Sequence, residues 1–352
     1  MLQKYLKITC FSLLALLIYS CKDNRLKVET PKLKKKVHID RFDKELFSCD
    51  SVHFGAAISQ LYKKYPDIMN AFMYDLYPHD FHRKKDIDTA EMLSLWQPLM
   101  VQNKFMKEVY LEMNKQYGEK EMKSLEEDLG DIFSHIKYYY PKDTVPEFAC
   151  IMNSFSYKIY ITQSNRFCIC LDMFLGEDYK YYSATNIDIP KFITRHCRKE
   201  YIPENIIKAY FTKKFESKVS TDNTLLSEVI QAGKELYFVD AMAPEMDDTL
   251  KIEYTAAQLK WCNDNAAEVW GYFTAKDIFF KTDQSLKIKF LNDAPFTNAD
   301  GVPQESAPRL GEWLGWQIVR KYMSEHKNIT LQQLMEEKDY RKILKESRYH
   351  PK

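Results

Sequence analysis

Three short β-forming runs stand close together in the middle of this chain, and they limit the sheet that it can build. The runs are rich in Ile, Tyr, Phe and Cys, and turn-forming pairs separate them at Asn153-Ser154 and Ser164-Asn165. They cover residues 148–151, 157–161 and 167–171. Elsewhere apolar residues recur at helical spacing, and 9 Gly in the whole chain are too few for a loop-rich β architecture. The sequence therefore predicts a mainly helical α+β fold with a small sheet in the middle of the chain.

Helical patterns fill both sides of these runs, after a short strand expected at 37–42. Residues 43–140 are predicted to be helical, with an N-cap pair at Asp88 and Glu91 and a last helix at 121–140 that ends before Pro141. Further helices are predicted at 189–197, 203–215, 225–239 and 311–322, one long helix from a capping box at 255–258 to 273, and a last helix capped at Thr330. No linker divides residues 37–352, which predicts one compact domain.

The N-terminus has the pattern of a secretory signal peptide. Its apolar segment, 8–19, follows a lysine-bearing start and is shorter than the ~20 residues of a membrane-spanning helix. Cys21 follows a small residue and precedes a polar run, which resembles a bacterial lipoprotein signal, although Tyr19 makes the pattern a loose one. We expect acyl chains on Cys21; an uncleaved signal anchor is the alternative. The predicted division is a signal peptide at 1–20, a lipid-anchored tether at 21–36 and a globular domain at 37–352.

This division predicts a protein held on a membrane of the bacterial cell envelope, with its domain outside the cytoplasm. We expect the domain to face the periplasm rather than the cell surface. The polar residues 22–36 suggest a flexible tether, whose lysine cluster at 32–36 either touches anionic lipid headgroups, at about 1 kcal/mol per charge, or is merely solvated.

Charge and cysteine content narrow the class of protein further. Lys and Arg number 51 and Asp and Glu 50, so the net charge is +1 at pH 7, which argues against a nucleic-acid-binding protein. Six cysteines remain after Cys10 and Cys21 are set aside; we expect most of them to be buried free thiols, although their spacing cannot exclude disulfides. They are Cys49, Cys150, Cys168, Cys170, Cys197 and Cys262.

A search for catalytic motifs finds no positive case for an enzyme. The sequence contains no HExxH, no glycine-rich phosphate loop and no GxSxG elbow. His79 and His82 lie one helical turn apart, but a surface pair is the simpler interpretation than a metal site. His196 and Cys197 are adjacent on an expected helix and so point apart, and Asp247-Asp248 is interpreted as a solvated acidic turn. We therefore predict no catalytic residues, no metal ligands and no cofactor.

Three segments together resemble one known family. They are Ile39-Asp40-Arg41-Phe42-Asp43-Lys44-Glu45-Leu46-Phe47, Gln231-Ala232-Gly233-Lys234-Glu235-Leu236-Tyr237-Phe238 and Pro308-Arg309-Leu310-Gly311-Glu312-Trp313-Leu314-Gly315-Trp316-Gln317-Ile318-Val319. With the lipoprotein signal, they resemble the gliding motility lipoprotein GldB of Bacteroidetes over essentially the whole mature chain. The resemblance implies an envelope lipoprotein whose partners are proteins of the gliding and associated secretion machinery. Because relatives also occur in non-gliding members of the phylum, motility itself does not follow.

The C-terminal segment and the helix at 225–238 also resemble a predicted zinc-protease family of the zincin type. A zincin helix carries His at i and i+4 around a catalytic Glu, and a later helix supplies another Glu. Overlaying that pattern places Lys208 and Thr212 at the two His positions, Ala209 at the base and Ala232 at the later Glu. The resemblance therefore implies a zincin-like scaffold without its metal ligands. The alternative is simple helix packing, in which Gly233, Gly311 and Gly315 permit close contacts.

Three hypotheses of function follow. The first is a non-catalytic envelope lipoprotein, an accessory or assembly component of gliding motility and associated secretion. The second is a metal-dependent hydrolase or peptidase with unusual ligands. The third is a lipid-tethered module that binds an unidentified ligand in an aromatic-lined cleft of roughly 300–1,000 Å³.

Overall fold

A four-stranded mixed sheet forms in the middle of the chain, as the sequence predicts. Its strand order is β1-β2-β4-β3, and β1 and β4 run parallel to β2 while β3 runs antiparallel to β4. The strands are β1 (Ile39–Asp40), β2 (Phe148–Ile151), β3 (Ile159–Ile161) and β4 (Phe167–Cys170). The computed structural model describes residues 24–33, 36–49, 52–76, 102–184, 187–216, 222–275, 277–293 and 306–352. The predicted cap at Asp88 and Glu91, the His79–His82 pair and Cys21 lie outside the described residues.

The two central strands are buried on both faces. Every residue of β2 and β4 is buried, because helices cover the sheet on either side, and the turn residues Ser154 and Asn165 adopt left-handed backbone angles. The thiols of Cys150, Cys168 and Cys170 lie in this core as free cysteines. All six expected thiols among the described residues are free, and of these Cys49 alone is only partly buried.

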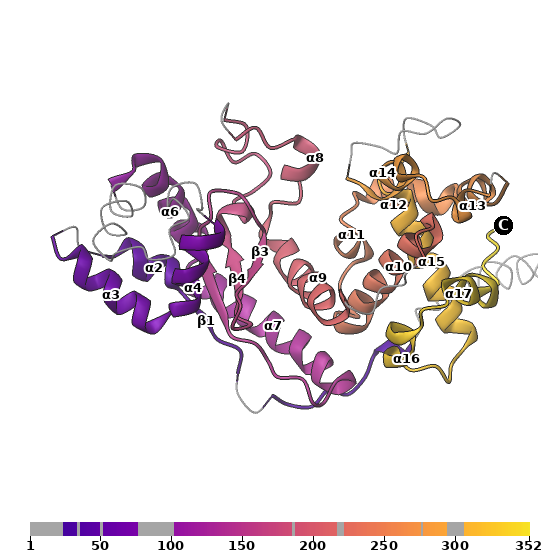
Figure 1. The fold of residues 1–352 in the computed structure, drawn as a ribbon, viewed down its shortest axis with the longest axis horizontal. Helices are drawn as coiled ribbons and strands as arrows, with labels where there is room; N and C mark the ends of the chain where they lie inside the picture. The colour runs from indigo at the N-terminus through magenta and orange to yellow at the C-terminus, as the bar shows by residue number, and fades with distance from the viewer. Residues whose placement is uncertain are drawn as a thin grey trace, which may run out of the picture.

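Helices of the N-terminal half surround the sheet (Figure 1). Phe42 of the first helix is fully buried and meets the ring of Tyr65 edge-on, with ring centroids 5.4 Å apart. The elements before the sheet are α2 (Phe42–Phe47), α3 (Phe54–Lys64), α4 (Pro66–Ala71), the π-helical turn η3 (Phe72–Leu76), α6 (Lys104–Gln116) and α7 (Glu119–Tyr139).

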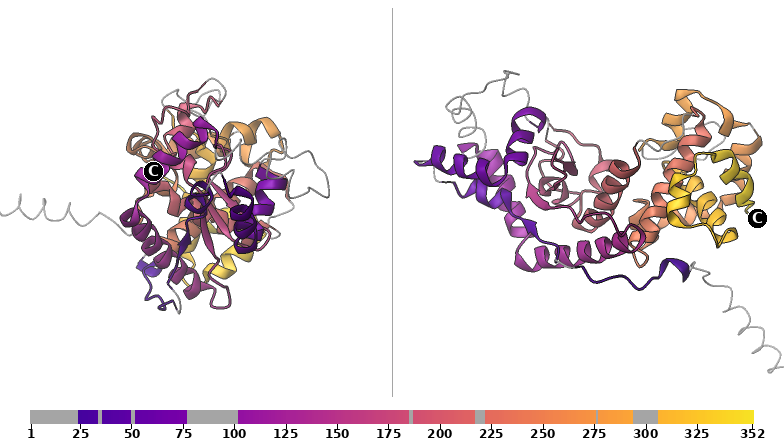
Figure 2. Two further views of the ribbon diagram at one scale, coloured as in Figure 1. Left: turned by 90° about the vertical axis from the view of Figure 1, so that its left-hand side faces the viewer. Right: turned by 60° about the horizontal axis from the view of Figure 1, so that its bottom comes forward.

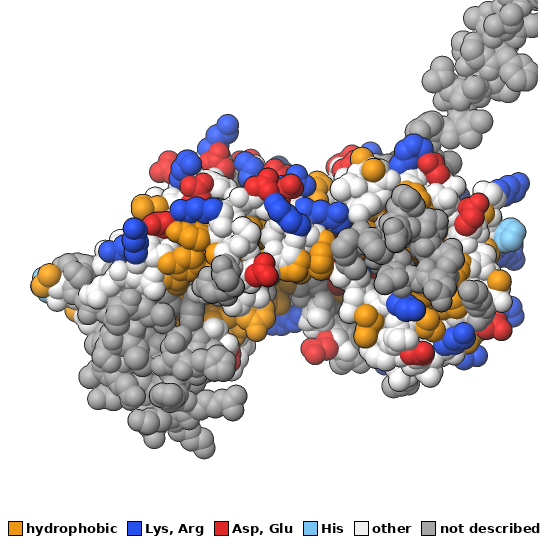
Figure 3. Space-filling model, turned by 90° about the horizontal axis from the view of Figure 1, so that it is seen from above, with side chains coloured by type: hydrophobic (Ala, Val, Ile, Leu, Met, Phe, Trp, Pro, Cys, Tyr) orange, Lys and Arg blue, Asp and Glu red, His pale blue; other side chains and the backbone are white. Residues whose placement is uncertain are grey.

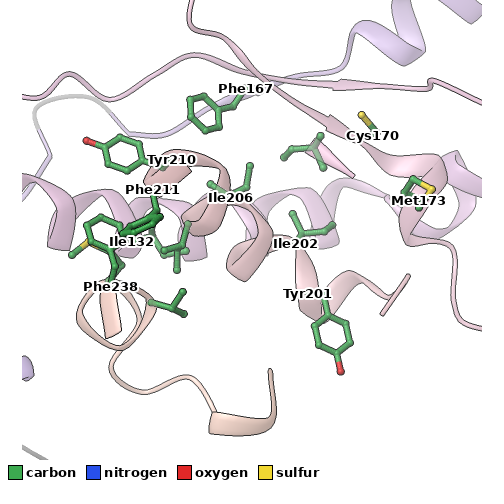
Figure 4. Close-up of a cluster of buried hydrophobic side chains, with 14 of the residues drawn as sticks. Ile132, Phe167, Cys170, Met173, Tyr201, Ile202, Ile206, Tyr210, Phe211 and Phe238 are labelled. Atoms are coloured by element: carbon green, nitrogen blue, oxygen red, sulfur yellow. The ribbon is translucent and has the colours of Figure 1, made fainter. Parts of the chain in front are cut away.

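Two helices join the sheet to the C-terminal half. α9 (Ile202–Phe215) packs against α7 and β3 on one side and against α10 (Leu225–Met242) on the other. Figure 4 shows Tyr210 on the side of Phe167 and Phe211 beside Phe238; the centroids of the latter two rings lie 5.5 Å apart. One continuous hydrophobic core therefore runs from the sheet into the C-terminal half.

The C-terminal half is built around the crossing of α10 and α15 (Leu310–Glu325). A Cβ on Gly315 would lie 1.9 Å from the carbonyl oxygen of Val229, and one on Gly233 would lie 2.3 Å from the carbonyl carbon and oxygen of Gly315. The expectation that Gly233, Gly311 and Gly315 permit close helix contacts is confirmed. The remaining elements are η5 (Leu171–Phe174), α8 (Lys191–Thr194), η6 (Lys199–Tyr201), α11 (Asp248–Lys251), α12 (Ala256–Asp264), α13 (Ala266–Ala275), η8 (Ile278–Phe280), α14 (Gln284–Leu291), α16 (Leu331–Glu336) and α17 (Tyr340–Ser347).

Three helix predictions need correction. α8 ends at Thr194, so His196 and Cys197 lie in the following turn rather than on a helix. The capping box at Thr255 is present, but the expected long helix is interrupted at Asn265, whose side chain donates a hydrogen bond back to the carbonyl of Trp261. Thr330 caps α16, yet α16 is not the last helix, because α17 follows it. The first two errors lie at helix ends, where local capping competes with helical periodicity.

The predicted flexible tether also differs from the structure. Residues 24–33, here called the N-terminal strap, lie along the surface of the domain and end beside the C-terminal half (Figure 2). Arg25 donates hydrogen bonds of 2.6 and 3.2 Å to the hydroxyl of Tyr237, and Lys27 forms a 2.8 Å ion pair with Glu245. The described residues thus form a single compact, mainly helical α+β fold, and none of their helices is long and apolar enough to cross a membrane.

Candidate functional site

A group of buried and partly buried charged side chains lies where α9, α10 and the start of α15 converge. We call it the interior charge cluster. It consists of Lys158, His196, Glu204, Lys208, Glu235, Glu253, Asp293, Arg309 and Glu312. Burying a charge is costly unless an opposite charge accompanies it, so such a group needs a physical explanation.

The first pair of the cluster lies on one face of α9. Glu204 and Lys208 are one helical turn apart and form an ion pair, and Glu204 is fully buried. Burial raises the pKa of Glu204, and the Lys208 ammonium opposes that shift. Burial alone would lower the pKa of Lys208, but the surrounding carboxylates of Glu204, Glu253 and Glu235 raise it above its usual value. Lys208 is therefore a permanent cation in this interior.

Glu253 is the carboxylate with the most cations around it. Its Oε1 lies 3.1 Å from Lys158 Nζ, and its Oε2 lies 3.4 Å from Arg309 Nη1. Burial alone would raise the pKa of Glu253, but Lys208, Lys158 and Arg309 hold it well below the usual range. Arg309 also donates a 2.6 Å hydrogen bond to the carbonyl of Ile252.

The backbone is strained on both sides of this ion pair. Glu253 has φ 56° and Arg309 has φ 50°, a region that residues with a Cβ rarely adopt. Such positions cost on the order of 1–3 kcal/mol each and persist where the surroundings hold them. Here the hydroxyl of Tyr254 donates to the carbonyl of Pro308, so the two strained loops are joined next to the ion pair. The contact between Glu253 and Arg309 therefore fixes the entry to α15.

His196 is buried beside this contact. Arg195 Nε donates a 3.0 Å hydrogen bond to His196 Nε2, so that nitrogen is an acceptor. Burial lowers the pKa of His196 to about 3, which keeps the ring neutral. Its Nδ1 lies 4.0 Å from Glu253 Oε2 and 4.0 Å from Asp293 Oδ2, beyond hydrogen-bond length. The imidazole therefore packs beside the carboxylates of Glu253 and Asp293, both of which face the Arg309 guanidinium.

The four positions taken from the zincin overlay fall close to the cluster. Lys208 belongs to it, Thr212 lines the same cavity as Glu235, and Ala209 is partly buried against the hydrophobic core. Thr212 and Ala232 line a cavity of about 730 Å³, together with Phe211, Phe215, Leu291 and the carboxylates of Glu235 and Glu312. Burial raises the pKa of Glu235 to about 7. Among the described residues, no group of three His, Cys, Asp or Glu side chains could hold a metal ion.

A second charged network, which the sequence analysis missed, lies at the other end of α10. Buried Asp240 accepts hydrogen bonds from Lys251 at 2.8 Å, from Trp316 Nε1 at 2.8 Å and from Arg320 at 2.7 Å. Asp248 accepts two further bonds from Arg320, so the interpretation of Asp247-Asp248 as a solvated turn is wrong for Asp248. Asp240 could have been noticed as the single acid in an otherwise apolar segment, 236–242.

In the view of Figure 3, the described part of the outer surface carries no large patch of one sign of charge. There, basic and acidic side chains alternate across both halves of the molecule, in keeping with the near-zero net charge.

The comparisons with known proteins gave one match. A family described as gliding motility protein GldB matches residues 23–351, while no curated protein and no solved structure matches the chain.

Proposed function

The chain belongs to the family of the gliding motility protein GldB, and on that premise we propose that it is a non-catalytic lipoprotein of the cell envelope. It acts as an accessory or assembly component of the gliding and associated secretion machinery, and its partners are proteins of that machinery. Acyl chains on Cys21 hold it on the membrane, with the domain facing the periplasm.

The observation that supports a non-catalytic role is that the chain's own cations engage Glu204 and Glu253, the two most buried carboxylates of the interior charge cluster. A catalytic carboxylate or metal ligand must be able to reach substrate or metal. Here Lys208 engages Glu204, while Lys158 and Arg309 engage Glu253. The same contacts stabilise strained backbone at the start of α15, which gives these charges a structural task.

Metal analysis of protein purified without chelators tests this proposal against the hydrolase hypothesis. We expect no stoichiometric zinc or other transition metal and no peptidase activity. Stoichiometric metal that is lost on replacing His79 and His82, or His196, would contradict the proposal and favour the hydrolase.

Replacing Cys21 tests the membrane anchor separately. The variant Cys21→Ala should leave the membrane fraction, fold normally by circular dichroism and fail to restore function in a strain that lacks the gene. Full restoration by this soluble variant would show that anchoring is dispensable.

The cavity between α9 and α10 favours a second candidate function. Its volume of about 730 Å³ lies within the range of small-molecule sites, and Phe211 and Phe215 contribute apolar wall. A ligand there would meet the carboxylates of Glu235 and Glu312. Thermal shift assays with small amines would detect such binding, and Glu235→Gln should abolish any shift.

A further inference from the structure

The N-terminal strap is held in one orientation along the domain. From Leu26 to Pro31 its residues alternate between partly buried and exposed, as expected for an extended chain lying on a surface. Leu26 packs against the hydrophobic core, and Leu26 and Lys27 line a cavity of about 370 Å³ together with Ser324. The strap is thus part of the folded domain.

Two contacts, made by Arg25 and Lys27, hold the N-terminal end of the strap on the C-terminal half; we call them the clamp. The Arg25 guanidinium donates to the hydroxyl of Tyr237 on α10 and lies 5.9 Å from the centroid of that ring. Lys27 pairs with Glu245, which follows α10. The strap precedes β1 in the chain, and its first residues lie beside the C-terminal half, so these contacts hold the start of the domain against that half (Figure 2).

This path decides where an anchor on Cys21 can lie. An undocked tether from Val37 to Cys21 would let the anchor move over a radius of roughly 50 Å around the sheet. With the strap docked, only three peptide units separate Cys21 from Asn24, so the anchor lies within about 11 Å of Asn24, the residue next to the clamp at Arg25.

We propose that the clamp fixes the orientation of the domain on a lipid bilayer. The surface around Tyr237, Glu245 and the exposed side of α15 faces the membrane, and α6 in the N-terminal half lies on the side away from it. This inference rests on the acylation of Cys21 proposed above. It adds that the strap, rather than the surface charge of the domain, selects the membrane-facing side.

Fluorescence quenching in vesicles tests this orientation. Full-length acylated protein with the background change Cys49→Ser is labelled at Ser324→Cys, beside the strap, or at Leu111→Cys, an exposed position on α6. It is then reconstituted in phosphatidylcholine vesicles that contain a headgroup-nitroxide lipid. We expect strong quenching of the label at position 324 and none at position 111. Equal quenching, or the reverse, would overturn the inference.

A matched pair of double variants tests the clamp itself. R25A/K27A removes both contacts and should abolish the difference in quenching between the two labels. K32A/K36A removes the same charge from exposed positions between the clamp and β1 and should preserve the difference. If R25A/K27A also preserves it, the clamp does not set the orientation.

Flotation of the vesicles separates this inference from the anchor. Wild-type protein that fails to float refutes acylation at Cys21 and the orientation with it. Protein that floats but shows equal quenching at both labels refutes only the orientation.

Discussion

The crossing of α10 and α15 should be the most sensitive packing site of this fold, and Gly315→Ala tests it. The added Cβ would lie 1.9 Å from the carbonyl oxygen of Val229, whereas ordinary contacts begin at 3.4 Å. The two helices must therefore separate by about 1.5 Å at this point. Trp313 and Trp316 of α15 are fully buried next to the crossing, so separation also loosens their packing.

The expected cost follows from two opposing effects. Overpacking a core costs about 1–3 kcal/mol, and the upper end or more applies here because the obstacle is backbone and cannot change rotamer. Alanine favours the helix over glycine by about 1 kcal/mol. We expect Gly315→Ala to lower the free energy of unfolding by about 3 kcal/mol, measured by urea denaturation with the m-value held constant.

The chain offers a matched control in the middle of α7. A Cβ on Gly130 would meet nothing within 4 Å, so Gly130→Ala should stabilise the protein by about 0.5–1 kcal/mol. Gly233→Ala acts at the same crossing, so the double variant with Gly315→Ala should lose less than the sum of the two single effects. If Gly315→Ala is as stable as wild type, the close helix contact does not exist and this reasoning fails.

Three further predictions concern buried polar groups. Lys208→Ala should lower the free energy of unfolding by about 3 kcal/mol, measured in urea, because it leaves the buried carboxylate of Glu204 without its cation. The double variant K208M/E204L should recover most of that loss. An unchanged midpoint of urea unfolding for Lys208→Ala would show that the pair is not buried. Burial raises the pKa of Asp172 to about 7, above its unfolded value of about 3.9. The protonated carboxyl therefore stabilises the fold fully below pH 4, and this stabilisation is lost as the pH rises through 7. As the pH rises from 4 to 8, the free energy of unfolding of Asp172→Asn relative to wild type should increase by up to about 4 kcal/mol in urea titrations. A difference that does not change with pH would refute the raised pKa. In the native mature protein a thiol reagent should modify Cys49 alone, and Cys49→Ser should abolish the reaction before unfolding; rapid modification of further thiols would contradict their burial.

The strands and the caps were predictable because their signals are local. The three β-forming runs in the middle of the chain became β2, β3 and β4, with strand ends within two residues of the predicted ones. The capping box at Thr255 formed as expected, since its two hydrogen bonds join residues three apart. The break at Asn265 was missed because a side chain bonding to its own helix leaves the apolar spacing unchanged.

The candidate site was only partly predictable. The overlay on a protease scaffold selected Lys208, Ala209, Thr212 and Ala232, and their assignment as former zinc-site positions stays a prediction. It missed Glu253 and Arg309, because they are 56 residues apart in the chain and only the fold brings their side chains to 3.4 Å. The family, by contrast, could be recognised from three short segments, and the match over residues 23–351 bears this out.

The sequence by itself determined most of the helices and strands, the presence of a small sheet and the family, because residues near one another in the chain carry those patterns. Only the tertiary structure decided which buried charges neutralise one another and where the N-terminal strap docks. Arg25 reaches Tyr237 across 212 positions of sequence. Such contacts depend on the path of the whole chain and on which charged groups are desolvated together in the interior. No short segment of the sequence determines either of these.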